Sequence, residues 1–249
     1  MVHRSQESQE DGIRPQERAR RRERAQRILD AAATLILRWG YNKTTLDDIS
    51  KQAGIAKGTM YLHWKTREEL FGALVKREKL GLAEDIKLRI SADPAGATLH
   101  GILKHSAMAL MQRPLMKAVL LHDLEMLGKL AHGEQSRTAY LEKLTGFKTY
   151  LEFLREYGLV RTDQSLEAQI YIFSAIFMGF FLVAPLMPSE YLPSDEEIAN
   201  LMAETVRCTL EAGCSSTSDE LATVSQTFMH YLNHATAMAQ EQFQKEVES

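Results

Sequence analysis

A short stretch near residue 60 carries side chains that can both hold a polyanion and read its bases. Lys57 and Thr59 can reach base edges, and Gly58 between them lets the backbone come close to a nucleic acid. Three residues at alternate positions follow, each suited to phosphate oxygens: Tyr61, His63 and Lys65. Tyr61 and the neighbouring Trp64 are also typical of a protein core, and for Trp64 we favour the core.

Two short helices would position these side chains. Thr45 and Asp48 form a Thr-x-x-Asp capping box that begins the first, and the start of that helix also offers a hydroxyl and amide N–H groups to a phosphate. Gly54 then turns the chain into a second short helix at 56–62. This arrangement predicts a helix-turn-helix, in which the second helix enters the major groove of DNA.

Two longer helices would support this unit. Apolar residues at helical spacing predict a helix over 18–39, ended by Gly40, with a crowd of arginines in its first turns. Thr66 and Glu69 form a second capping box and predict a helix over 67–89. The segment 91–97, which contains a proline, closes the unit.

The charge distribution agrees with a polyanion site at this end of the chain. The whole chain has a formal net charge of -3, but residues 1–90 hold 19 Lys and Arg against 13 Asp and Glu. Residues 14–67 alone carry 13 basic and 5 acidic side chains, whereas 91–249 carry 11 and 20. Binding to phosphates through such a basic segment is expected to depend steeply on salt.

The pattern Thr44-Thr45-Leu46-x-x-Ile49-x-x-x-Ala53-Gly54-Ile55-x-x-Gly58-Thr59-x-Tyr61-x-His63-Trp64-x-x-x-Glu68-x-Leu70 resembles the signature of the TetR family of transcriptional regulators, and the resemblance covers about residues 20–71. The chain departs from it mildly: the family usually has Phe at Trp64 and Lys at Arg67. The resemblance implies a homodimeric regulator, mostly a repressor, that releases its operator when a small molecule binds. By position, it places the contacts to double-stranded DNA at Lys43, Thr45, Lys57, Gly58, Thr59, Tyr61, His63 and Lys65.

The remainder of the chain also reads as helical, so the predicted fold is all-α, an amino-terminal helix-turn-helix unit followed by a larger helical bundle. Helices are expected at about 97–112, 115–131, 134–157, 165–187 and 195–212, with a last amphipathic helix after a polar hinge at 214–218. The expected organisation is a polar, disordered arm at 1–17, a DNA-binding domain at 18–90, an effector-binding and dimerisation domain at 91–213, and a helical extension at 214–249.

An uncharged run over 170–187 admits three interpretations. It lies at the short limit of a membrane span, but it contains a glycine and a proline and lacks flanking Lys or Arg, so we expect no membrane contact. It fits a helix buried on all sides. By its place in the family pattern, it would form the homodimer interface together with 195–212. Its phenylalanines could equally build the core of one subunit.

The sequence also predicts a pocket for a small hydrophobic effector. Met residues at helical spacing suit an adaptable pocket, although they are more often core, and a few polar groups nearby could orient a ligand. The candidates are His105, Met108, Met111, Met126, Tyr140, Phe177 and Met178. His122, Asp123, Glu125 and His132 lack the i, i+4 spacing of metal ligands on one helical face, so we expect no metal and no cofactor.

Other classes of protein are disfavoured. The amino terminus lacks the apolar run of a signal peptide, and two cysteines give no disulfide framework, which favours the cytoplasm. We find no phosphate loop, nucleophile elbow or paired carboxylates that would indicate an enzyme. The alternative that remains open is a constitutive or protein-responsive DNA-binding dimer without a small-molecule effector.

Overall fold

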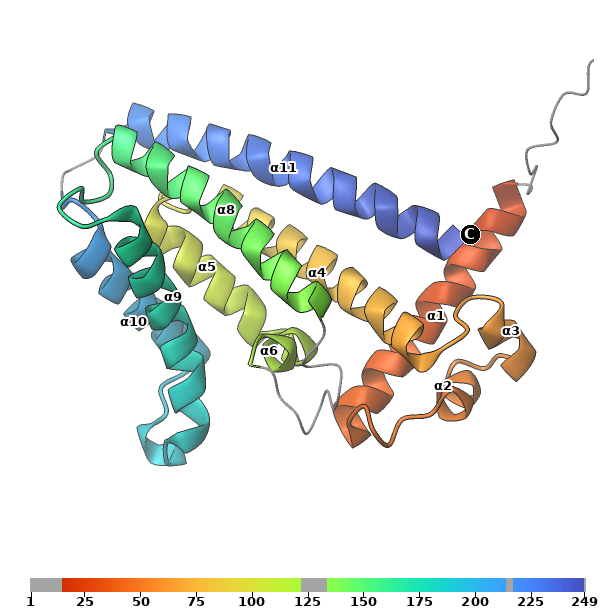
Figure 1. The fold of residues 1–249 in the computed structure, drawn as a ribbon. Helices are drawn as coiled ribbons and strands as arrows, with labels where there is room; N and C mark the ends of the chain where they lie inside the picture. The colour runs from red at the N-terminus through yellow and green to blue at the C-terminus, as the bar shows by residue number, and fades with distance from the viewer. Residues whose placement is uncertain (1–14, 122–133, 214–216, 249) are drawn as a thin grey trace, which may run out of the picture.

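The computed structural model describes residues 15–121, 134–213 and 217–248. Four helices form the amino-terminal unit: α1 (Pro15–Trp39), α2 (Leu46–Gln52), α3 (Lys57–Tyr61) and α4 (Arg67–Ser91) (Figure 1). Their apolar faces meet in one core, in which Ile28, Met60 and Leu74 are fully buried. Trp64 is 4% exposed and belongs to this core. The all-helical, helix-turn-helix prediction is therefore confirmed.

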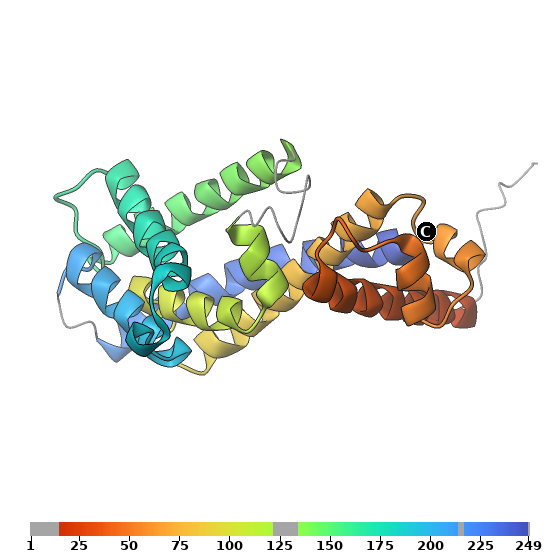
Figure 2. The same cartoon turned by 90° about the horizontal axis from the view of Figure 1, so that it is seen from below.

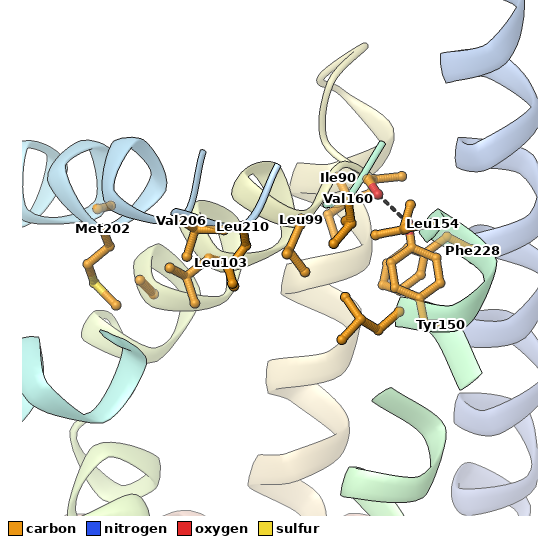
Figure 3. Packing of buried hydrophobic residues seen from close by; sticks show 14 of the residues in the cluster. Ile90, Leu99, Leu103, Tyr150, Leu154, Val160, Met202, Val206, Leu210 and Phe228 are labelled. Carbon is orange, nitrogen blue, oxygen red and sulfur yellow. Dashed lines mark hydrogen bonds between the residues drawn. The ribbon is translucent and has the colours of Figure 1, made fainter. Parts of the chain in front are cut away.

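The larger body contains α5 (Leu99–Met111), α6 (Pro114–Leu120), α8 (Glu134–Glu156), α9 (Leu166–Val183) and α10 (Asp195–Leu210). Their buried side chains form a second core, to which the carboxy-terminal end of α4 contributes Ile90 (Figure 3). Tyr150 donates a hydrogen bond to the carbonyl of Ala97 inside this core. The only extended pairing in the described residues is an isolated bridge between Val160 and Glu211.

The helix boundaries follow local capping chemistry. Ser194 and Glu197 form a reciprocal capping box that begins α10, and Ser165 caps α9 through the amide of Ala168. Pro114 lies in the first turn of α6, where its missing N–H costs nothing. The helix predicted at 115–131 begins as α6, which ends at Leu120 with Leu121 as its C-cap; residues 122–131 lie outside the described residues. α9 ends at Val183 and passes into a 3-10 turn at Ala184–Leu186, earlier than the predicted end at residue 187.

The expectation that the uncharged helix is buried on all sides is wrong for the single chain. In α9 only Leu166, Gln169 and Phe181 are buried. By length and composition alone, Leu166–Leu186 is suited to cross a membrane, with a mean hydropathy of 1.9, yet only 11% of it is buried within the chain. Aliphatic and aromatic residues of α9 pack on the body, whereas much of its outward face is left uncovered.

The last helix, α11 (Ser218–Glu248), spans the whole length of the molecule. It begins beside α8 and runs along α4 to α1, where the carboxy terminus lies (Figure 1). The view from below also shows it behind α4 (Figure 2). Its early turns contribute Val224 and Phe228 to the core of the body, whereas Phe243 and Val247 belong to the core of the amino-terminal unit.

Candidate nucleic-acid interface

The start of α2 is held by the predicted capping box. Asp48 N–H donates to Thr45 Oγ1 over 3.2 Å, and Thr45 N–H donates to Asp48 Oδ2 over 3.2 Å. Hydrogen bonds from Thr45 hold the pKa of Asp48 below its usual range. Because both side chains are committed to the cap, the Thr45 hydroxyl is fixed in place at an exposed helix start, where the dipole favours an anion.

The turn between α2 and α3 requires a glycine. Gly54 has a φ of +64°, in the left-handed region that other residues enter only with strain. The amide of Ile55 donates to the carbonyl of Ser50 over 3.0 Å, which closes the turn. This geometry fixes the direction in which α3 leaves α2.

α3 is anchored on one side and open on the other. Met60 is fully buried, whereas Lys57, Gly58 and Tyr61 are exposed, Tyr61 by 43%. A Cβ placed on Gly58 would meet nothing within 4 Å, so the chain itself does not require glycine there. Thr59 is half-buried beside this open face. The exposed face of α3 is therefore a surface that a large partner can approach to backbone distance.

Lys57 is partnered within the helix-turn-helix. Its Nζ lies 2.7 Å from Oδ1 of Asp47, the second residue of α2, and both side chains are about half exposed, at 56% and 51%. The hydrogen bond to Asp47 raises the pKa of Lys57. The pair directs the ammonium group of Lys57 toward α2. A phosphate that takes the position of the Asp47 carboxylate would have to displace it.

His63 differs electrostatically from its lysine neighbours. Burial, together with the nearby guanidinium groups of Arg21 and Arg24, lowers its pKa to about 4, so the ring is neutral at physiological pH. The ring packs against Trp64 with centroids 5.6 Å apart. A contact from His63 to phosphate would therefore use a neutral ring N–H and not a positive charge.

Comparison with known proteins supports what this geometry indicates. The family described as "Bacterial regulatory proteins, tetR family" matches residues 28–74, which run from the middle of α1 through α2 and α3 into α4. The chain therefore carries a domain of the TetR family. It is a DNA-binding transcriptional regulator. Hereafter the amino-terminal unit formed by α1, α2, α3 and α4 is called the TetR domain.

Curated relatives of this TetR-family chain are also regulators. The chain is 29% identical over 148 residues to the HTH-type transcriptional regulator AcrR of Shigella flexneri, covering 57% of this chain and 68% of that protein. It is 39% identical over 77 residues to the fatty acid metabolism regulator protein of Bacillus subtilis, covering 29% of this chain and 39% of the relative. This second match spans well under half of the relative, so its whole-protein properties do not transfer directly.

Solved structures of TetR-family proteins share the fold. The SmeT–triclosan complex aligns with a TM-score of 0.61 at 21% identity, covering 79% of this chain and 97% of that one. NalD, the secondary repressor of the MexAB-OprM multidrug efflux pump in Pseudomonas aeruginosa, aligns with a TM-score of 0.51 at 19% identity, covering 77% and 98%. At these identities the likeness extends to the fold alone.

Sequence reasoning missed two arginines that hold the TetR domain together. One Nη atom of Arg67 donates to the carbonyls of Tyr41 and Thr44 over 3.1 and 3.2 Å, and its guanidinium lies 4.0 Å from the Tyr41 ring centroid. Arg21 donates to the carbonyl of Leu62 over 2.9 Å and so joins α1 to the end of α3. Both contacts join residues more than 20 positions apart, which a local pattern does not reveal.

The predicted DNA contacts lie on one part of the TetR domain. Lys43, Thr45, Lys57, Gly58, Tyr61 and Lys65 are exposed on or beside α2 and α3, whereas Thr59 and His63 are half-buried. Lys65 donates a hydrogen bond to the Glu69 carboxylate through its backbone amide, so this bond does not involve the Lys65 ammonium group. Only half of the predicted second capping box is therefore present. Thr66 Oγ1 accepts a hydrogen bond from the Glu69 amide, but the Glu69 carboxylate accepts from the amide of Lys65 and not from that of Thr66.

The predicted effector residues whose side chains the structure describes lie on two helices of the body, α5 and α9. His105 Nε2 lies 2.8 Å from Asp93 Oδ2, at the joint between α4 and α5. Three others pack in part against the core of the body: Met108, Met111 and Phe177. Met178 is half-buried in α9, while Met126 and the side chain of Tyr140 lie outside the described residues. Three of the predicted residues therefore pack against one core, and the predicted pocket stays a prediction.

One open hollow lies elsewhere in the body, between α5 and α10. It has a volume of about 660 Å³ and is lined by His100, Lys104, Pro193, Glu197, Asn200, Leu201, Ala203, Glu204 and Arg207. None of the predicted effector residues lines it. Within the described ranges, no three His, Cys, Asp or Glu side chains gather as metal ligands would; His122, Asp123, Glu125 and His132 lie outside those ranges.

Proposed function

We propose that the protein is a homodimeric repressor that binds a palindromic operator and releases it when a small hydrophobic effector binds the body. The observation that carries the dimer is the uncovered face of α9. Tyr171, Leu182 and Leu186 are 75%, 54% and 79% exposed in the single chain. Ala175 and Gly179 lie between them at helical spacing. An apolar stripe of this kind needs a dry partner.

A second copy of the chain is the partner that this face fits. α10 packs beside α9, and its Leu201 is 51% exposed. Paired across a twofold axis, α9 and α10 of two chains would form a four-helix bundle. The interface proposed is 170–187 with 195–212, now restricted to their outward residues. Phe177 is not among them, because its ring packs edge-on against Phe181 at 5.2 Å.

The dimer is tested by Gly179→Asp. A Cβ at Gly179 meets nothing within 4 Å, so each single chain of the variant should still fold. An unpaired carboxylate buried in the proposed dimer interface costs several kcal/mol and should prevent dimerisation. Glu152→Asp, on the exposed face of α8, is the control. We expect light scattering to show half the mass for Gly179→Asp only. A folded, dimeric Gly179→Asp would place the interface elsewhere.

For DNA, we propose contacts from Lys43, Thr45, Lys57, Gly58, Thr59, Tyr61, His63 and Lys65. The exposure of six of them on or beside α2 and α3 and the basic charge of residues 14–67 support this assignment. Affinity for a duplex enriched from a random library by the full chain, hereafter the selected duplex, should fall steeply with salt. A flat plot of log affinity against log salt would contradict a phosphate-based interface.

The effector remains a proposal of chemical class. The SmeT structure was obtained as a complex with triclosan, a hydrophobic phenol, and NalD is the repressor of an efflux pump. By analogy we propose an apolar or phenolic ligand in the body, near His105, Met108, Met111, Met126, Tyr140, Phe177 and Met178. Triclosan is the first probe: a rise in melting temperature together with release of the selected duplex supports the proposal. If no compound of a broad hydrophobic panel releases the selected duplex, a constitutive dimer without an effector is favoured.

The remaining assignments follow from this function. We propose domain limits of 18–90 for DNA binding, 91–213 for effector binding and dimerisation, and 214–249 for the carboxy-terminal extension. The predicted limit of the amino-terminal arm at residue 17 is too late, because α1 begins at Pro15. We further propose a cytoplasmic protein without enzymatic activity, because its relatives are regulators and its chemistry is that of binding.

A further inference from the structure

The carboxy-terminal helix is anchored in both cores of the molecule. At one end Val224 is fully buried in the core of the body, and the ring of Phe228 packs at a tilt against Tyr150, with ring centroids 4.6 Å apart. At the other end Phe243 and Val247 are 7% and 3% exposed in the core of the TetR domain. The two anchor points are 23 residues apart, about 35 Å along a continuous helix at 1.5 Å per residue.

Ion pairs reinforce the anchor in the TetR domain. Glu246 pairs with Lys76 of α4 at 2.6 Å, and Glu248 pairs with Arg22 in the arginine-rich start of α1. The two acidic residues therefore reach two different helices of the domain on either side of the buried Val247. Exposed pairs of this type add little stability, but they fix the rotation of the helix end.

α4 is a second rigid connection between the two cores, and α6 adds a contact by placing Leu115 in the core of the TetR domain. Its residues Leu70 and Leu74 are buried in the TetR domain and Ile90 in the body. A single helix would allow the domain to swing about its exit point. Two helices that pack along each other and are anchored at both ends remove that freedom.

We propose that α11 is a strut that fixes the orientation of the TetR domain relative to the body, so that a change in the body reaches the DNA-binding surface through two helices. The seat of the strut is Phe243 and Val247 against α1 and α4. Without this seat the domain keeps its own fold but samples a range of orientations. DNA binding then has to select one of them, which weakens affinity without loss of any DNA contact.

The test compares two carboxylates placed in the same turn of α11. Val247→Asp puts a charge into the seat, whereas Gln244→Asp puts it on the exposed face and is the control. The orientation is measured without DNA, as the distance distribution between spin labels at Gln52→Cys in α2 and Glu152→Cys in α8. Both native cysteines are replaced by serine, and labelled chains are diluted with unlabelled ones so that only pairs within a chain contribute.

We expect a narrow distribution for the control and a broad one for Val247→Asp, with the selected duplex bound about tenfold more weakly by Val247→Asp. A chain that ends at Met238 removes the seat without burying a charge and retains Val224 and Phe228; it should behave as Val247→Asp does. An unchanged distance distribution in the shortened chain would overturn the proposal, because α4 and the Leu115 contact of α6 would then set the orientation without α11. Since the distance is measured without DNA or effector, this result is independent of the proposed repression.

Discussion

Asp47 Oδ1 lies 2.7 Å from Lys57 Nζ, across the turn that joins the two helices of the helix-turn-helix. The carboxylate thus lies beside a lysine that the family pattern assigns to DNA. It has two opposing effects: it holds the lysine side chain in one direction, and it repels the phosphates that the lysine would bind.

We expect repulsion to dominate because both side chains are about half exposed, so the pair itself contributes little. Asp47→Asn should therefore bind DNA more tightly, with the larger gain for nonspecific duplex. Lys57→Ala should weaken binding and reduce the slope of log affinity against log salt by about 1, as expected for one lost phosphate contact. Fluorescence anisotropy over a salt series measures both. Weaker binding by Asp47→Asn would mean that the carboxylate acts mainly by orienting Lys57.

Gly58 separates the requirements of folding from those of DNA binding. Because a Cβ there meets nothing within 4 Å, Gly58→Ala should leave the fold intact and stabilise α3 by up to about 1 kcal/mol. The same methyl group would stand between the backbone and DNA, so affinity for the selected duplex should fall. Gly54→Ala is the converse case, since its φ of +64° makes any side chain costly in the folded chain itself. Unchanged DNA affinity in Gly58→Ala would show that the backbone of α3 does not approach DNA closely.

His63 gives the folded protein a dependence on acid. Its pKa falls from 6.5 to about 4 on folding, so between these values the unfolded chain binds a proton that the folded chain does not. Stability should therefore be lost as the pH falls through this window and should be unaffected by His63 above it. Denaturant unfolding of His63→Gln should show a smaller loss between pH 6.5 and 4 than the parent chain. Parallel pH profiles for the two proteins would show that the ring is not shielded.

The sequence was most informative where the controlling interactions are local. The Thr45 and Asp48 capping box joins residues three positions apart, and its presence and the helix that it begins were both predictable. Arg67 reaches carbonyls 23 to 26 residues away, so its clamp on the loop before α2 could not be read from spacing. The apolar face of α11 was recognisable, but not that its last turns pack on α1 and α4.

The uncharged helix α9 shows a different limit. Its hydropathy fits a membrane span, a buried helix or a subunit interface equally well, because all three remove the same apolar side chains from water. The structure separates the two faces, with Phe181 buried against the body and Leu186 left 79% exposed. Composition does not distinguish the two faces, because the distinction depends on which face of α9 packs against the rest of the chain.

The most direct test of the account is the stoichiometry of the full chain on its selected duplex, measured by light scattering of the complex. Two recognition helices related by a twofold axis should select an inverted repeat with half-sites about 34–36 Å apart, or a multiple of that distance, and should give two chains, or a multiple of two, per duplex. One chain bound to a single, non-repeated site would contradict the proposed dimeric operator complex.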